Sequence, residues 1–232
     1  MCIMDNSELL NLQKEVEELR KYKKVIDCIK GENGGRCNIS DFLPVDDIPK
    51  NVQLKLYEFN LEVNNKFPIT LNIPFKNDEP CNNQSLGNQI PNKFKEYLIN
   101  EPLLKNKIKF NKMSWAGYPD EKVIIEGIES PLLWEWKSIY SNDGDGVRIV
   151  LSKFPNKRIP LTFNDCVKKY HLWICLNYNK VVDNERKVTE INIEKMIVHC
   201  VYSNTIINTK FELSTSSSQI KTNIDEGNII VL

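Results

Sequence analysis

Two acids and a lysine near the middle of the chain are arranged as in a hydrolytic active site. Asp120 stands just before one short apolar run, residues 123–125, and Glu135 and Lys137 follow a second run, residues 132–134, on the same expected strand. Carboxylates hold divalent cations, and a nearby ammonium group can orient a water molecule or stabilise negative charge. The three side chains are therefore the parts of a metal-dependent hydrolytic site.

A β-hairpin over residues 118–139 would bring these groups together. Gly127, Ser130 and Pro131 separate the two apolar runs, which is typical of two strands joined by a tight connection. Residues i and i+2 of a strand share a face, so Glu135 and Lys137 are expected to point the same way.

Charges inside so apolar a strand need a partner, because burying an unpaired carboxylate or ammonium group costs several kcal/mol. Asp120, on the neighbouring arm of the hairpin, and a divalent cation would supply that partner. Oxygen ligands suit a hard ion, so we expect Mg²⁺, with Mn²⁺ as a substitute.

An ordinary edge hairpin with a cross-strand ion pair is the alternative explanation of the same residues. Acid-x-Lys triplets also occur at residues 120–122 and 185–187, as expected in a chain rich in Asp, Glu and Lys. The triplet at 135–137 differs from both, because it lies inside an apolar strand beside a second strand headed by Pro-Asp.

Pro119-Asp120 followed by Glu135-Trp136-Lys137 resembles the motif of the PD-(D/E)xK nuclease superfamily, which includes many type II restriction endonucleases. The resemblance implies that Asp120 and Glu135 are metal ligands, that the backbone carbonyl of Trp136 is a further ligand, and that Lys137 orients or activates the attacking water. It also implies a Mg²⁺-dependent endonuclease that cuts double-stranded DNA at specific sites. A helix before the core sometimes adds another acid in that family, and Glu96 is the local candidate.

The fold class expected is α/β (α+β), with a restriction-endonuclease-like mixed central sheet flanked by helices. The chain has 232 residues, of which 41% are hydrophobic, enough for one sizeable domain. We expect a single nuclease-like domain over residues 32–232, with its catalytic core over about 91–180.

Residues 1–31 are expected to form a separate amphipathic helix. Between Ser7 and Lys30 apolar residues recur at three- and four-residue steps, with Glu and Lys on the other faces. About three heptads allow a coiled coil and hence a homodimer, whereas docking on the helix's own domain is the alternative.

The remaining elements are expected from periodicity and turn residues. Alternation over 52–63 and 67–75 predicts an additional β-hairpin, the polar segment 76–89 predicts a loop, and Pro91 at a first helical position predicts a helix to about Leu98. Further strands are expected over 107–113, 147–152, 172–176 and the last third of the chain, with a short helix ending near Tyr170.

The charges are balanced, with 31 basic and 31 acidic residues, which argues against an indiscriminate polyanion binder. Basic residues nevertheless cluster on both sides of the motif. The downstream cluster supplies candidate phosphate contacts, although solvated faces of strands and helices explain any single one of them. The candidates are Arg148, Lys153, Lys157 and Arg158.

The seven cysteines include no Cys-x-x-Cys pair, so reduced thiols in a cytoplasmic protein are expected. No apolar run is long enough to cross a bilayer, and the first residues lack a signal-peptide pattern. Two other functions remain open. One is a non-enzymatic interaction protein that pairs through its N-terminal helix, and the other is a structure-selective DNA repair nuclease that shares the three site residues.

Overall fold

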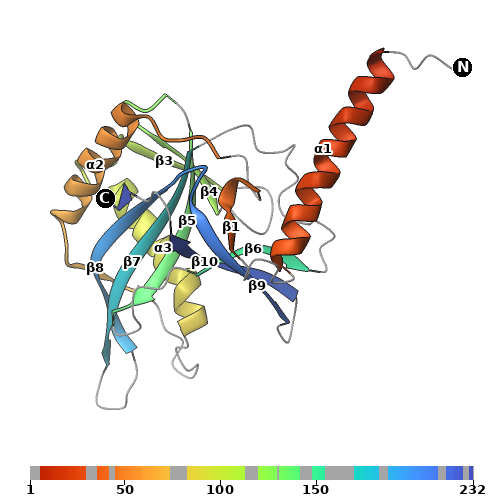
Figure 1. Cartoon of the computed structure of the whole chain (residues 1–232). Helices are drawn as coiled ribbons and strands as arrows, with labels where there is room; N and C mark the ends of the chain where they lie inside the picture. Colours follow the sequence, from red (N-terminus) through yellow and green to blue (C-terminus); the bar gives the residue numbers. More distant parts are fainter. Residues whose placement is uncertain are drawn as a thin grey trace, which may run out of the picture. The chain divides into compact units, whose positions relative to one another are not determined.

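A computed structural model describes the chain in eleven ranges: residues 6–29, 36–41, 45–73, 83–112, 120–129, 131–141, 148–154, 170–182, 188–213, 218–226 and 230–231. Within these ranges there are three α-helices, α1 (Asn6–Ile29), α2 (Lys50–Asn64) and α3 (Asn83–Asn100), a short 3-10 helix η2 (Ile39–Asp41) and two β-sheets (Figure 1). The fold is therefore mixed α/β.

The larger sheet has seven strands in the order β11-β8-β7-β5-β4-β3, with β2 also paired to β8. Strands β5 and β7 run parallel, and every other pair in this sheet is antiparallel. The predicted mixed central sheet is confirmed, while its restriction-endonuclease-like character stays a prediction. The strands are β2 (Ile69–Leu71), β3 (Ile108–Lys112), β4 (Glu121–Ile125), β5 (Leu132–Tyr140), β7 (Tyr170–Val182), β8 (Val188–Val201) and β11 (Ile230–Val231).

The smaller sheet has four antiparallel strands in the order β1-β9-β10-β6. They are β1 (Arg36–Asn38), β6 (Arg148–Phe154), β9 (Ile206–Leu213) and β10 (Ser218–Glu226). The strand expected over 147–152 thus exists as β6, but it pairs with β10 and not within the larger sheet.

Contacts divide the chain into two compact units. One comprises residues 1–44, 148–167 and 203–227, and the other comprises 45–147, 168–202 and 228–232. The division expected from the sequence, a helix over 1–31 and a single domain over 32–232, stays a prediction, because contact units do not show which segments fold independently.

Helix α2 replaces the strands predicted over residues 52–63, so that prediction is wrong. Its buried face comprises Val52, Leu56, Phe59 and Val63, spaced by four, three and four residues as on a helix. Leu54, between Val52 and Leu56, is 58% exposed. Val52 and Leu56 are therefore buried on successive turns of one helix face and are not alternate residues of a strand.

Helix α3 begins at Asn83, so the loop predicted over 76–89 and the helix start predicted at Pro91 are both wrong from residue 83 onward. Leu86, Ile90, Phe94 and Leu98 recur every four residues and are fully buried. This apolar face holds the first turns of α3 in place despite their polar composition and despite the backbone donor missing at Pro91.

An aromatic cluster joins both helices to the same face of the larger sheet. Trp134 of β5 packs edge-to-face with Phe59 of α2, and Trp136 packs edge-to-face with Phe94 of α3. Phe110 of β3 contacts both tryptophan rings. Trp134 and Trp136 are two residues apart, so the cluster fixes which face of β5 points to the helices.

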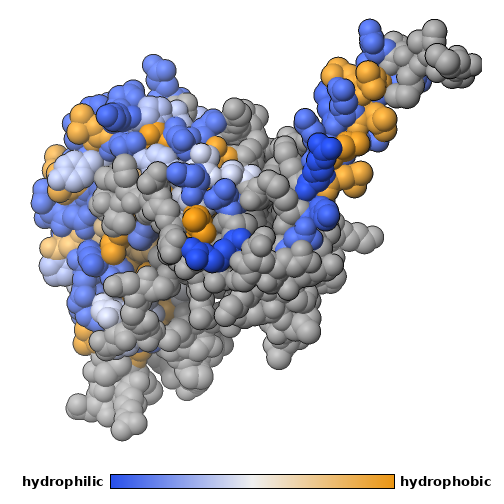
Figure 2. Space-filling view, viewed as in Figure 1, coloured by the Kyte–Doolittle hydropathy of each residue, from blue (hydrophilic) through white to orange (hydrophobic). Residues whose placement is uncertain are grey.

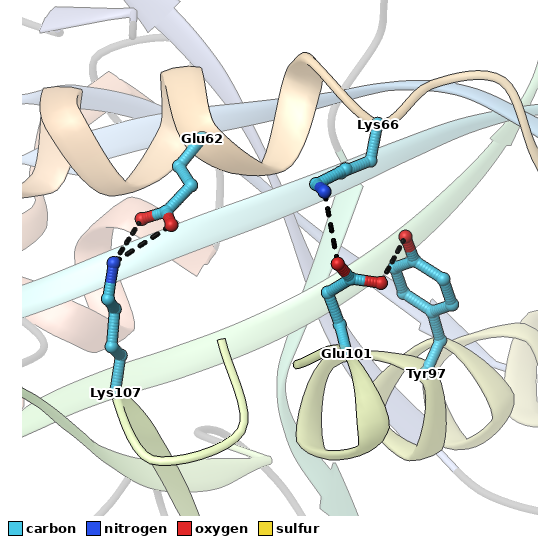
Figure 3. A network of polar contacts seen from close by, with 5 residues as sticks. All are labelled: Glu62, Lys66, Tyr97, Glu101 and Lys107. Carbon is cyan, nitrogen blue, oxygen red and sulfur yellow. Dashed lines mark hydrogen bonds and ion pairs between the residues drawn. The ribbon is translucent and has the colours of Figure 1, made fainter. Parts of the chain in front are cut away.

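Polar contacts reinforce the helix layer at its ends (Figure 3). Glu62 near the end of α2 accepts two hydrogen bonds from Lys107, at 2.8 and 2.9 Å. Lys66, just after α2, pairs with Glu101 at 3.0 Å, and Tyr97 also donates to Glu101. These pairs tie α2 to the segment that follows α3 and leads into β3.

Several predicted elements are confirmed. Helix α1 spans Asn6–Ile29, strand β3 lies within 107–113, and the hairpin of the motif forms from β4 and β5. Strand β7 is central, as predicted, because residues 171–178 are all buried. The short helix expected before Tyr170 and the turn at 142–146 lie outside the described residues.

Strand β2 confirms the alternation around Ile69 and Leu71, but its partner is β8 and not the segment that precedes it. Among the described helices, none combines the length and the apolar character needed to span a bilayer.

Candidate functional site

The register of the β4–β5 hairpin brings Asp120 and Glu135 opposite each other. Glu121 pairs with Trp134 and Lys122 with Leu133, so Asp120, one step further, comes beside Glu135. Gly127 in the connection has φ 78°, a conformation that glycine adopts without steric cost and that lets the chain reverse tightly. The local sequence therefore sets the alignment of the two acids.

The two faces of β5 are chemically different. Leu132, Trp134 and Trp136 point to the helices, so Glu135 and Lys137 project from the opposite face. Lys137 Nζ donates a hydrogen bond to Glu135 Oε1 at 2.7 Å. The structure thus brings these two predicted residues together as an ion pair. The side chain of Glu135 is 6% exposed and that of Lys137 is 23% exposed.

Asp120 contacts the strand from its edge. Its Oδ2 accepts a hydrogen bond from the backbone N–H of Trp136 at 2.9 Å. The N–H and C=O of one strand residue point to the same side, so the carbonyl oxygen of Trp136 lies on the edge that faces Asp120. Two carboxylates and one backbone carbonyl are therefore available around the same stretch of β5.

Burial raises the pKa of Glu135 to about 7. The value of about 7 is a net result, because the charge and the hydrogen bond of Lys137 lower this pKa, the Asp120 carboxylate raises it, and a backbone hydrogen bond of Asp120 lowers it. At neutral pH a proton and a cation would therefore compete for this carboxylate.

A divalent cation fits these donors. Glu135 Oε2 is buried and accepts no hydrogen bond from the described residues, so one oxygen of a costly buried charge has no partner there. Mg²⁺ is commonly held by one or two carboxylates together with waters and substrate phosphates. No cluster of three or more His, Cys, Asp or Glu side chains occurs in the described ranges, so further ligands would be the Trp136 carbonyl and water.

A second buried ion pair lies on the helix side of the hairpin, and sequence reasoning missed it. Glu121, 5% exposed, pairs with Lys95 of α3 and accepts a hydrogen bond from Trp136 Nε1 at 3.1 Å. Trp136 is therefore held through its backbone by Asp120 and through its ring by Glu121. Period two from Val123 could have placed Glu121 on the buried face, but nothing local points to Lys95.

We expect this pair to stabilise the fold. Lys95→Met should lower the free energy of unfolding by about 2–3 kcal/mol, since it leaves the buried Glu121 carboxylate without its cation. Adding Glu121→Gln should recover most of that loss, because no lone charge then stays buried. Urea unfolding at pH 7 measures both effects.

Lys93→Met is the matched control on the same helix. Lys93 pairs with Glu96 at 2.7 Å, but 36% and 59% of the two side chains are exposed. Removing such an exposed pair should cost less than about 1 kcal/mol. If the Lys95→Met/Glu121→Gln double variant were as unstable as Lys95→Met alone, the cost would not come from an unpaired charge.

The other predicted site residues lie elsewhere or outside the described part of the chain. Glu96 is exposed on α3, where it pairs with Lys93 and lines a surface hollow of about 400 Å³. Arg148 and Lys153 belong to β6, but the positions of their side chains are not described, and residues 155–169, with Lys157 and Arg158, lie outside the described ranges. Their contact with DNA stays a prediction.

Two buried thiols, Cys175 and Cys200, are poor candidates for a catalytic nucleophile. Burial raises the pKa of Cys175 and of Cys200 to about 12, so both are protonated at neutral pH. Burial also lowers the pKa of His199, next to Cys200 in sequence. A protonated thiol is a poor nucleophile, and these residues are better explained as part of the core.

No family model and no curated protein matches this chain. The chain is similar to the crystal structure of the restriction endonuclease BglI bound to its DNA recognition sequence, at 12% sequence identity and a TM-score of 0.35. The alignment covers 96% of this chain and 87% of that one. A TM-score of this size is too low to establish a common fold.

Proposed function

We propose that the chain is a Mg²⁺-dependent endonuclease that hydrolyses phosphodiester bonds of double-stranded DNA at specific sites. The observation that carries the proposal is the environment of Glu135. This buried carboxylate has Lys137 on one oxygen, no partner among the described residues on the other, and Asp120 beside it. Two acids and one lysine, gathered on β5 and at the start of β4, suit metal-assisted hydrolysis better than they suit a purely structural role.

Asp120 and Glu135 would hold the ion, with the carbonyl of Trp136 as a further ligand. A bound Mg²⁺ supplies a water of lowered pKa and offsets the negative charge that builds up on the phosphate oxygens. Lys137 would orient the water for in-line attack, and its ammonium group already lies 2.7 Å from Glu135. The burial of Glu135 strengthens its own electrostatic interactions.

The substrate follows from chemistry and from the resemblance together. The site is suited to phosphodiesters, and the likeness of its residues to the motif of type II restriction endonucleases makes duplex DNA the expected polymer. The balanced charge supports selective over indiscriminate binding. Sequence-specific cleavage would require base contacts in addition to phosphate contacts.

Digestion of a long linear DNA of known sequence tests this function. With Mg²⁺ or Mn²⁺ we expect discrete fragments whose sequenced ends share one motif, and with a chelator we expect no cleavage. Asp120→Asn, a change at an exposed side chain, should abolish cleavage without loss of folding. The Glu126→Gln variant, altered at an exposed acid of the same hairpin, should cleave normally.

The outcomes separate the alternatives. Cleavage of branched DNA in preference to linear duplex would indicate a structure-selective repair nuclease with the same site. The absence of cleavage, together with equal Mn²⁺ binding by the wild type and by Asp120→Asn, would refute the metal site and favour a non-enzymatic interaction protein.

A further inference from the structure

Helix α1 carries a stripe of exposed apolar side chains. Leu9, Leu12, Val16 and Leu19 are 46, 49, 38 and 66% exposed. They are spaced by three, four and three residues, which is the spacing of positions a and d in a heptad. Figure 2 shows apolar side chains gathered along one side of this helix, between charged ones.

The described residues of its own unit leave this stripe exposed. Helix α1 contacts η2 and β9, and its C-terminal end lies near β9 in Figure 1. Five large apolar residues, these four and Leu10, nevertheless stay in contact with water along the N-terminal part of the helix. A helix of 24 residues gains most of its stability by burying such a face.

We propose that α1 pairs with α1 of a second copy of this chain as a parallel two-stranded coiled coil. The apolar positions favour two strands, since β-branched Val16 at a with Leu12 and Leu19 at d is the arrangement preferred in parallel dimers. The next a position is Lys23, which is exposed. A single lysine at an a position costs stability but specifies the register and the dimeric state.

Charge complementarity sets the direction of the pair. In this heptad Glu15 occupies position g and Arg20 occupies the following position e, and both are exposed. A parallel pair places Glu15 beside the partner's Arg20, and symmetry produces this contact twice. An antiparallel pair would bring g against g and e against e, so Glu15 and Arg20 could not pair across the seam.

The test measures self-association of the full chain by sedimentation equilibrium from about 1 to about 100 µM. The wild type should form dimers. Leu12→Glu/Leu19→Glu should weaken the dimer by more than about 100-fold, because it places charges in the buried seam. Leu54→Glu/Leu103→Glu, at leucines that are 58 and 56% exposed outside α1, is the matched control and should dimerise as the wild type does.

Charge reversal tests the direction. Glu15→Arg and Arg20→Glu should each weaken self-association by roughly 3- to 10-fold at low salt, and mixing the two variants should restore a tight heterodimer, because both contacts are then attractive. A monomeric wild type, or a Leu12→Glu/Leu19→Glu variant that still dimerises, would overturn the proposal. Tighter association of Glu15→Arg alone would overturn the parallel arrangement. None of these outcomes depends on nuclease activity.

Discussion

Glu135→Gln should reduce the rate of DNA cleavage by about 10²- to 10⁴-fold at saturating Mg²⁺, the range seen when one charged group is removed from a catalytic site. The substitution keeps the shape of the side chain but removes the charge that would hold the cation. Lys137→Met should have an effect of similar size, since it removes the ammonium group 2.7 Å from Glu135. Single-turnover cleavage of a labelled duplex measures both rates.

Controls separate this loss from unfolding. Lys137→Met alone leaves the buried Glu135 carboxylate without its cation, so its folding must be checked by circular dichroism and thermal unfolding. The double variant Glu135→Gln/Lys137→Met removes both charges and should fold well yet stay inactive. Glu126→Gln and Lys109→Met change exposed residues of the same sheet region and should cleave at the wild-type rate. A folded Glu135→Gln variant with full activity would refute the catalytic assignment.

The second large effect concerns stability as a function of pH. The pKa of Glu135 is about 7 in the folded chain, against an ordinary value of 4.5. The folded state therefore holds this proton more tightly than the unfolded state does. Its contribution to stability is fully present below about pH 4.5 and is lost as the pH rises through about 7. A pKa shift of this size corresponds to about 3 kcal/mol in the free energy of unfolding.

Glu135→Gln should imitate the protonated side chain. At pH 8 and without divalent ions we expect it to be more stable than the wild type by up to about 3 kcal/mol, whereas at pH 4 the two should be equal. Urea unfolding of both proteins across this range measures the difference. Comparing the two curves cancels other titrating groups, such as His199, whose pKa is lowered by burial.

Mg²⁺ should cancel most of this difference in stability between the wild type and Glu135→Gln. An ion that binds the folded wild type at 100 times its dissociation constant adds about 2.7 kcal/mol at pH 8, while the Glu135→Gln variant should gain far less. If the wild type and Glu135→Gln were equally stable at pH 8 both without and with Mg²⁺, two conclusions would follow. The charge on Glu135 would not destabilise the fold, and Glu135 would not bind the ion.

Local sequence was sufficient for the hairpin that holds the candidate site. Two short apolar runs separated by Gly127 predicted β4 and β5, and the two-residue spacing of Glu135 and Lys137 predicted that these charges share a face. These features are local, because each depends on residues fewer than 20 positions apart. The predicted helix α1 and strand β7 rest on equally regular patterns.

Long-range packing decided the rest. The segment 52–63 contains apolar residues that fit either period, and only the sheet face beneath it selects Val52, Leu56, Phe59 and Val63 and so makes a helix. The polar start of α3 is held by four buried residues whose partners lie elsewhere in the chain.

Strand pairing and the second ion pair depend even more on tertiary structure. Strand β2 pairs with β8, more than a hundred positions away, and β6 joins a different sheet from its neighbour β5. Lys95 reaches Glu121 only because α3 packs on the hairpin. Local sequence was enough to select Asp120, Glu135 and Lys137 as the candidate site residues. Their burial and pairing could not be predicted locally, because both depend on packing between segments that are far apart along the chain.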